Sequence, residues 1–349
     1  MRLGIVGLAS RYWPAAFAGC ARRLPGAELL AAADLDRTPA ELQATLGMDA
    51  ESFAARFGVR LHHDPATMIA REGLEAVFVC AEHTAQPELV ELACRAGCHV
   101  YVAKPMATTV AGAERIVQAV RRAGVIASSG NTERYDGALR EAHRLLRDGA
   151  IGELLMVRTL HQHGSIDDFG PDDWYRRPEQ GGPELSLLWY TADVLSWFVD
   201  SPVVRVYAEY DNFATPGSPF MDNGKAIFRF ANRVLGSLDV YFAVRGWQMP
   251  RWEIELVGTR GAVRTQQSAY EGTLFTAAGA RGFYRQQQDV LLAEVRAWLE
   301  CCRQGSEPEV TVEQARDVIE IALACRRSNQ LKQPVTLHHQ APPLPEGAG

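Results

Sequence analysis

A glycine turn near the start of the chain could bind an anionic cofactor. The stretch Gly7-Leu8-Ala9-Ser10-Arg11-Tyr12 follows a compact apolar run and fits Gly-x-Gly-x-x-Gly, with Ala9 and Tyr12 replacing the second and third glycines. The first glycine permits a tight turn, and the second lets the backbone approach a pyrophosphate. A pyrophosphate would lie near Ser10, at the N-terminus of the next helix, where free N–H groups favour an anion. Taken alone, the eroded motif is a weak signal.

Asp34 strengthens this interpretation. It ends the second apolar run, close to the distance beyond the glycine turn at which an acidic side chain meets the adenosine ribose hydroxyls. A carboxylate at that point repels a 2′-phosphate, so the sequence predicts NAD, with NADP as the alternative because Arg37 lies nearby and could reverse the preference. A helix N-cap or a solvated strand end is the other interpretation of Asp34.

A polar and aromatic stretch between Gly164 and Gln180 could recognise a substrate. Trp174 offers a flat apolar ring for a pyranose, and Arg176 could meet an acidic group, although a solvated loop with internal salt bridges fits as well. His161 and His163 lie two apart on an expected strand and therefore share one side of it. They are candidate proton-transfer groups or packing residues.

The first 125 residues supply the elements that would position these groups. Short apolar runs alternate with helix-period segments, which is typical of βαβ units. Strands are expected at 3–6, 28–33, 76–80 and 99–102, with a helical stretch over 40–57 that breaks near Gly47. The pattern predicts an α/β Rossmann domain with a parallel, doubly wound sheet over residues 1–125.

Residues 126–339 read as an α+β domain for substrate binding and oligomerisation. Period-two runs at 154–163, 203–210, 225–230, 234–242 and 252–257 predict a large open, mainly antiparallel sheet built as a meander. A helix is expected over 289–302, and Thr311-x-x-Gln314 predicts a capping-box start for the last helix. An open face predicts a homodimer or homotetramer formed through the sheet. The tail 340–349 is expected to be disordered.

Composition excludes several classes of protein. The chain has 349 residues and a net charge of -6 without a basic stripe, so we expect no nucleic-acid partner. We expect no membrane partner, because no run of about 18 uncharged apolar residues occurs. Seven cysteines, an odd number, appear without a secretory leader, which favours reduced thiols and a cytoplasmic location. We expect no metal site.

Two further motifs carry a family resemblance. The stretch Val102-Ala103-Lys104-Pro105-Met106 looks like an E-K-P motif with Ala103 in place of Glu, and Cys80-Ala81-Glu82-His83-Thr84-Ala85-Gln86 resembles a T-P-N-x-x-H loop. With its C-terminal pattern at 294–337, the chain resembles the glucose-fructose oxidoreductase / inositol dehydrogenase / MocA family. The resemblance implies NAD or NADP, hydride transfer with sugars or cyclitols, and a nicotinamide side formed by Ala81, His83, Gln86 and Lys104.

The resemblance also exposes a departure in the family's proton-handling motif, G-G-x-x-x-D-x-G-x-H-x-x-D. The matching stretch, Gly181 to Asp193, keeps the spacing and Asp193, but it has Ser186 at the first Asp position and Tyr190 at the His position. The acid/base that the family normally uses is therefore missing.

Three interpretations of this departure are open. In the first, Tyr190 replaces the histidine and is helped by Lys104, since a nearby cation lowers a phenol pKa. In the second, another group acts, such as His163 or His161. In the third, the chain binds dinucleotide without turnover, as a sensor or scaffold. Redox-assisted glycoside cleavage is a further alternative. Our leading hypothesis is an NAD(P)-dependent dehydrogenase or reductase of a sugar-like or cyclitol hydroxyl or carbonyl. Lys104 and Tyr190 are its predicted catalytic residues, and its predicted substrate-binding residues are Asp193, Ser186, His163, Trp174 and Arg176.

Overall fold

The computed structural model describes residues 1–164, 173–243, 252–266, 271–285 and 288–337. The chain forms two compact units. The first unit contains Met1–Asp136, Ile166–Tyr190 and Gln287–Ile319, and the second unit contains Gly137–Ser165, Thr191–Gln286 and Glu320–Gly349. Each unit is therefore assembled from separate stretches of sequence. Domain boundaries at residues 125 and 339 stay a prediction, and the tail 340–349 lies outside the described residues.

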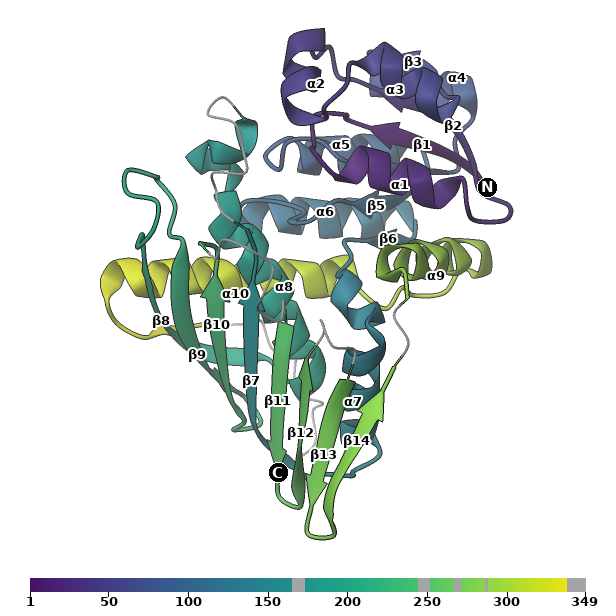
Figure 1. Cartoon of the computed structure of the whole chain (residues 1–349). Coiled ribbons are helices and arrows are strands. Elements are labelled where there is room, and N and C mark those ends of the chain that lie inside the picture. The colour runs from purple at the N-terminus through teal and green to yellow at the C-terminus, as the bar shows by residue number, and fades with distance from the viewer. Residues whose placement is uncertain (165–172, 244–251, 267–270, 286–287, 338–349) are drawn as a thin grey trace, which may run out of the picture. The chain divides into compact units, whose positions relative to one another are not determined.

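The first unit is built on a parallel six-stranded sheet with strand order β3-β2-β1-β4-β5-β6 (Figure 1). The strands are β1 (Arg2–Val6), β2 (Glu28–Ala33), β3 (Arg60–His62), β4 (Ala76–Val79), β5 (His99–Val102) and β6 (Ala127–Ser128). This order confirms the predicted doubly wound Rossmann sheet. The order reverses between β1 and β4, and in such sheets the ligand crevice lies beyond the carboxyl ends of the strands at that point.

The helices of the first unit pack on this sheet through apolar faces. They are α1 (Trp13–Ala21), α2 (Pro39–Thr45), α3 (Ala50–Phe57), α4 (Pro65–Glu72), α5 (Gln86–Arg95), α6 (Val110–Ala123) and α9 (Val290–Gln304). The predicted helical break near Gly47 is confirmed, because Asp49 caps α3 through the backbone N–H of Ser52. Helix α9 joins the core through Trp298, whose ring centroid lies 5.3 Å from that of Phe78. Truncating so buried a tryptophan to alanine typically costs roughly 3–5 kcal/mol.

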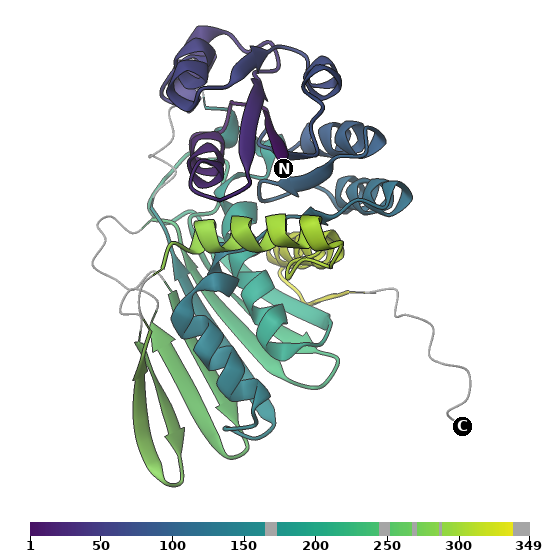
Figure 2. The same ribbon diagram turned by 90° about the vertical axis from the view of Figure 1, so that its right-hand side faces the viewer.

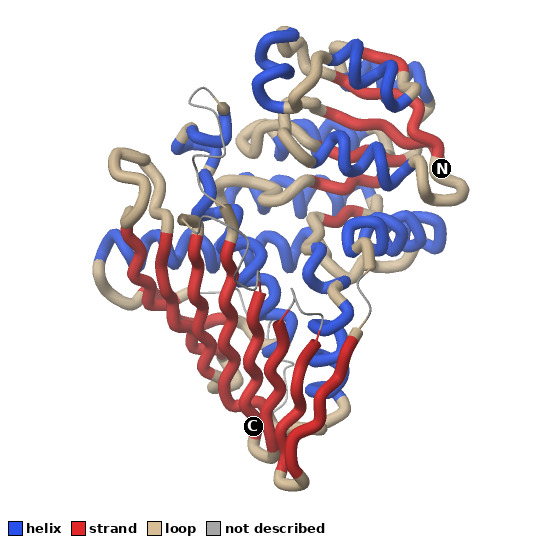
Figure 3. The backbone as a smooth tube through the Cα atoms, viewed as in Figure 1, coloured by secondary structure: helices blue, strands red, loops and turns tan. Residues whose placement is uncertain are grey.

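The second unit contains a nine-stranded sheet with order β14-β13-β12-β11-β7-β10-β9-β8-β15 (Figure 3). Its strands are β7 (Leu154–Gln162), β8 (Val203–Asp211), β9 (Asn223–Phe230), β10 (Leu235–Tyr241), β11 (Trp252–Gly258), β12 (Gly261–Gln266), β13 (Glu271–Thr276), β14 (Gly279–Tyr284) and β15 (Val335–Thr336). The mainly antiparallel prediction is confirmed. The simple meander is wrong at one place, because β7 lies between β10 and β11 and pairs with β10 in parallel. The alternation of side chains along a strand specifies which face of the sheet each residue occupies, but it does not specify which strand lies next to it.

Helices cover one face of the second sheet. Helix α7 (Gly137–Arg147) packs against β12 and β13 (Figure 2). Helices α8 (Gly182–Val199) and α10 (Val312–Leu331) each contribute residues to both units. The predicted capping box is present at the start of α10, where Gln314 N donates to Thr311 Oγ1 at 3.2 Å. No helix in the described part of the chain is long and apolar enough to cross a membrane.

Candidate active site

The turn after β1 has the shape that the glycine motif predicts. Gly7 has a φ of +90°, and a Cβ there would lie 2.9 Å from the backbone N of Ala81, so a side chain at this position would be strained and crowded. Ala9 keeps a negative φ and is buried, and Ser10 is buried beside it. Tyr12 is 58% exposed and does not cap α1 with its side chain. Tyr12 therefore points to solvent and does not separate the helix from the sheet.

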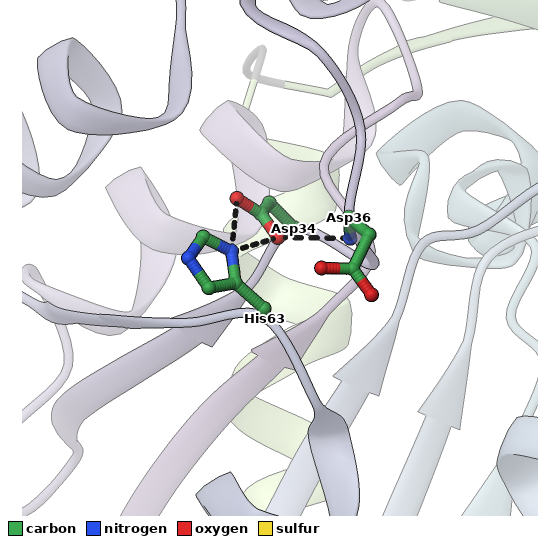
Figure 4. A group of neighbouring side chains, drawn as sticks. All are labelled: Asp34, Asp36 and His63. Carbon is green, nitrogen blue, oxygen red and sulfur yellow. Dashed lines mark hydrogen bonds and ion pairs between the residues drawn. The ribbon is translucent and has the colours of Figure 1, made fainter.

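Asp34 closes a strained turn at the end of β2 (Figure 4). Its buried carboxylate lies 3.0 and 3.1 Å from Nδ1 of His63 and accepts a hydrogen bond from the backbone N of Asp36 at 3.0 Å. Leu35 and Asp36 both have positive φ values, 61° and 57°. Non-glycine residues in this region store strain, which concentrates at functional sites. The hydrogen bond to Asp34 is the main reason why the pKa of His63 is raised.

Asp34, Asp36 and His63 are also close enough to share a cation, because their potential ligand atoms all lie within 4.8 Å of one another. Hydrogen bonds inside the group already engage both Asp34 oxygens. His63 and Asp36 are exposed at the surface, and exposed acidic groups commonly occur without a metal. The group is best described as a hydrogen-bonded turn that fixes the Asp34 carboxylate.

Arg37 links this turn to the loop after β4. Its Nη2 lies 2.7 Å from Oε1 of Glu82, and its Nη1 lies 3.4 Å from Oε1 of Glu41. Glu82 also contacts Arg177 at 3.5 Å and accepts a hydrogen bond from Gln180 Nε2 at 3.2 Å. Sequence reasoning did not single out Glu82 or Gln180, although Glu82 lies inside the loop that resembles T-P-N-x-x-H. The Arg37 guanidinium is therefore engaged by carboxylates.

A short segment after residue 172 lies against the glycine turn and against the loop after β4. It contains two 3-10 helices, η3 (Trp174–Arg176) and η4 (Pro178–Gln180). Trp174 Nε1 donates to the carbonyl O of Ala9 at 2.7 Å, and its ring meets the His83 ring edge to face at 4.9 Å between centroids. Arg176 is half-buried in the same segment. The structure thus places Trp174, a predicted substrate-binding residue, on the glycine turn.

His83 is held as a neutral imidazole. Its Nδ1 lies 2.7 Å from the carbonyl O of Gln180, which can only accept, so Nδ1 carries the proton and Nε2 is an acceptor. Burial lowers the pKa of His83 to about 4, and the charge of Lys104 adds to that shift. Gln86 donates from Nε2 to the carbonyl O of Pro105 at 2.8 Å. Its Oε1 is buried and has no hydrogen-bond partner among the described residues.

Lys104 and Tyr190 come together at the carboxyl end of β5. Lys104 Nζ lies 4.1 Å from the centroid of the Tyr190 ring and 6.0 Å from the Trp13 ring. An ammonium on an aromatic face is attracted by the ring quadrupole. Asn131 Nδ2 donates to the backbone O of Tyr190 at 3.2 Å and helps to fix α8 there. Trp13 and Asn131 were missed from the sequence, although Trp13 directly follows the glycine turn.

The remaining predicted residues are distributed over both units. Ser186 is buried in the first unit beside Tyr175; burial raises the pKa of Tyr175, and the Ser186 hydroxyl offsets part of that rise. Asp193 and His163 belong to the second unit. Asp193 is buried on α8, three residues after Tyr190. His163 follows β7 and packs on Phe242, with 5.8 Å between ring centroids. His161 stacks on Trp252 at 4.1 Å, which is a packing arrangement.

Comparison with known proteins gives consistent matches over both units. Residues 1–131 match the family model described as the oxidoreductase family with an NAD-binding Rossmann fold, and residues 139–264 match the GFO/IDH/MocA C-terminal domain. A myo-inositol 2-dehydrogenase of Thermotoga maritima is 25% identical over 296 residues, which cover 80% of this chain and 84% of that protein. A D-apiose dehydrogenase of Paraburkholderia graminis is 28% identical over 293 residues, covering 78% of this chain and 76% of that protein.

A solved structure supports the same fold. The crystal structure of an oxidoreductase from Agrobacterium radiobacter, in complex with NAD+, L-tartaric acid and magnesium, superimposes with a TM-score of 0.83. The match covers 96% of this chain and 98% of that chain at 19% sequence identity. At this identity the likeness establishes the architecture.

Proposed function

The chain belongs to the Gfo/Idh/MocA family of NAD-binding oxidoreductases, and from that premise we propose that it transfers hydride between NAD and a hydroxyl or carbonyl carbon of a sugar-like polyol or cyclitol. The observation that carries this proposal is Lys104, which is held on the Tyr190 ring at 4.1 Å beside a Rossmann turn. The substrate class is supported by the two relatives, which are named for myo-inositol and D-apiose.

The residues present fit a dinucleotide. Gly7 permits the tight turn after β1, with the backbone of Ala81 packed where a side chain would lie. Helix α1 begins without a side-chain cap, so its first N–H groups, apart from Pro14 which has none, are not taken up by a capping side chain and suit an anion. Gln86 presents a buried carbonyl oxygen that accepts no hydrogen bond from the residues that the structure describes. We assign the phosphate side to Gly7, Ala9, Ser10 and Tyr12, and the nicotinamide side to Ala81, His83, Gln86 and Lys104. The bound nicotinamide supplies the hydride acceptor or donor.

The turn after β2 favours NAD over NADP. The Asp34 carboxylate is fixed by its hydrogen bonds. A carboxylate has about four lone-pair sites, so acceptor capacity remains for a ribose hydroxyl. The same negative charge repels a 2′-phosphate. Arg37, which could reverse this preference, is paired with Glu82 at 2.7 Å.

Lys104 and Tyr190 form the proposed proton-handling pair. The ammonium stabilises negative charge that develops on the substrate oxygen, and the Tyr190 hydroxyl exchanges the proton. The face of the Tyr190 ring lies 4.1 Å from the ammonium and helps to hold it in place. His83 is a neutral acceptor in the same neighbourhood and serves to position the cofactor.

Five residues remain candidates for substrate binding: Asp193, Ser186, His163, Trp174 and Arg176. Asp193 supports this assignment by its position one helical turn after Tyr190, because residues three apart share a helix face. Trp174 also has a structural role, since its indole N–H donates to the carbonyl O of Ala9 in the glycine turn. In that role its ring packs against His83.

We also propose a cytoplasmic homodimer or homotetramer formed through the second sheet. All seven cysteines are free thiols, which suits a reducing compartment. On the outer face, Ile227 and Met156 are 51% and 48% exposed. Charged pairs lie between them, including Arg158 with Asp239 at 3.1 Å. Apolar side chains among charges are compatible with a subunit interface, and analytical ultracentrifugation with a wild-type and an Arg158→Glu protein tests this.

A pair of Tyr190 variants tests the proposed chemistry. Purified protein is screened with NAD against myo-inositol, D-apiose and related polyols, and the best substrate is assayed with Tyr190→Phe and Tyr190→Leu. Tyr190→Phe keeps the ring under Lys104 and removes the hydroxyl, so we expect kcat to fall roughly 10²-fold with little change in NADH affinity. The kcat of Tyr190→Leu should fall further, because the Lys104 ammonium also loses the aromatic ring that it contacts. Full activity in Tyr190→Phe would exclude the hydroxyl as the proton carrier.

A further inference from the structure

Arg37 is unexplained by the function proposed above. An arginine at the end of the second strand is the group that accommodates the 2′-phosphate of NADP in Rossmann proteins. We infer that Glu82 is a specificity-determining residue: its carboxylate occupies Arg37 and so prevents that arginine from accepting a 2′-phosphate. This inference rests on the proposed function, because it concerns the same cofactor site.

The contacts of Arg37 identify Glu82 as its main partner. The Nη2–Oε1 distance to Glu82 is 2.7 Å, whereas the Nη1–Oε1 distance to Glu41 is 3.4 Å. The other oxygen of Glu41 accepts hydrogen bonds from the backbone N and hydroxyl of Thr38 at 2.8 and 2.9 Å, so Glu41 is engaged as the capping box of α2. The contacts of Glu82 are different, because its carboxylate contacts the side chains of Arg37, Arg177 and Gln180 and takes part in no helix cap among the described residues.

The Glu82 pair is partly shielded from water. The Glu82 side chain is 11% exposed and that of Arg37 is 28% exposed. Ion pairs at this depth interact more strongly than pairs on the open surface, because less solvent screens them. Releasing Arg37 would leave a largely buried carboxylate without its closest cation, which is costly.

A network holds the Glu82 carboxylate in place. Gln180 Nε2 donates to Oε2 at 3.2 Å, and Arg177 lies 3.5 Å from Oε1. Gln180 is itself fixed by Thr84, with the backbone N of Thr84 donating to its Oε1 at 3.1 Å. The carboxylate is therefore held toward Arg37 by groups of the protein itself.

Two acidic groups then disfavour NADP by different routes. Asp34 repels the 2′-phosphate directly. Glu82 acts through Arg37, because the phosphate can gain that guanidinium only by displacing a carboxylate already bound to it. NAD has no 2′-phosphate for Arg37 to bind, so we expect the affinity for NAD to be independent of the Arg37–Glu82 pair.

The test compares the dissociation constants of NADH and NADPH by calorimetry on the full chain and its Glu82→Gln variant. We expect NADPH affinity to rise about fivefold to tenfold and NADH affinity to stay within about twofold. Glu91→Gln is the matched control, because it breaks the pair with Arg115 at 2.9 Å between α5 and α6. It should change neither constant.

A second variant separates release of Arg37 from general loosening. Adding Arg37→Ala to Glu82→Gln should abolish the gain for NADPH, and a gain that survives would overturn the inference. Circular dichroism and thermal melting establish folding. If Glu82→Gln does not fold, Glu82→Asp, which retracts the charge by one methylene, should give a smaller gain, and no gain would overturn the inference.

The outcomes for the inference and for the proposed function are distinct. Folded wild-type protein that binds neither NADH nor NADPH contradicts the proposed function. Wild-type protein that binds NADH, with an unchanged NADPH to NADH ratio in folded Glu82→Gln, contradicts only the role of Glu82.

Discussion

The two ends of the proposed cofactor site are built differently. At the adenosine end, Asp34 with His63 and Arg37 with Glu82 form two ion pairs, whose side chains range from 4% to 69% exposed. At the nicotinamide end, the ammonium of Lys104 lies against the ring of Tyr190, close enough to the buried His83 to lower its pKa. Partly exposed charges change affinity by modest factors, whereas a cation held beside the reacting atoms changes rates strongly.

This contrast predicts that the largest effect comes from Lys104. Lys104→Met keeps most of the side-chain volume and removes the charge, so kcat/KM should fall roughly 10²–10³-fold while the NADH dissociation constant changes by less than about threefold. Steady-state kinetics and calorimetry on the same preparation measure both. Lys225→Met, which breaks a pair with Asp239 in the second unit, is the control. An unchanged kcat/KM in Lys104→Met would contradict the expectation that charge at the nicotinamide end controls the reaction rate.

At the adenosine end, Asp34→Asn should have an intermediate effect. The amide replaces one acceptor by a donor and removes the negative charge, so NADH affinity should fall about tenfold and discrimination against NADPH should weaken. Titration with both nucleotides measures the change. Asp36→Asn removes an exposed charge from the same turn and should alter NADH affinity much less. Equal losses in the two variants would mean that net charge, rather than the Asp34 oxygens, recognises the ribose.

The smallest expected effect is a pH dependence set by His63. Its hydrogen bond to Asp34 raises its folded pKa, and the charges of Asp36 and Glu51 act in the same direction. The stabilising contact is therefore complete below the unfolded pKa and is lost as pH rises through the folded pKa. Protonated His63 competes with ribose for Asp34, so NADH affinity should increase roughly twofold to threefold between about pH 6 and pH 8.

His63→Ala supplies the control for this pH dependence. Its NADH affinity should be flat over the same interval and close to the wild-type value at high pH. His83 does not contribute, because burial lowers its pKa to about 4, below the interval. A slope that persists in His63→Ala would assign the titration to another group.

Local patterns in the sequence predicted the elements and the end of β2. Alternating apolar runs located the parallel strands, and the acidic residue after the second run located Asp34, because strand ends and side-chain alternation are local properties. The capping box at Thr311 was predictable for the same reason. The eroded glycine turn was also interpretable, since Gly7 alone carries the unusual φ there.

Contacts between distant segments could not be predicted in this way. Glu82 meets Arg37 across 45 positions, and Trp174 meets Ala9 across 165. Helix α9 joins the core of the first unit although its sequence follows the second sheet. The parallel insertion of β7 beside β10 is of the same kind. Such contacts depend on topology, which periodicity does not encode. Lys104 and Tyr190 were paired through a family motif, and the ring-face geometry came only from the structure.

The measurement that tests the central claim most directly is a paired calorimetric titration of folded, nucleotide-free wild-type protein with NADH and with NADPH. The account predicts that NADH binds at least about tenfold more tightly, because Asp34 recognises the ribose and Glu82 withholds Arg37 from a 2′-phosphate. Equal or tighter binding of NADPH would contradict the assignment of the adenosine end, and binding of neither would contradict the proposed function as a whole.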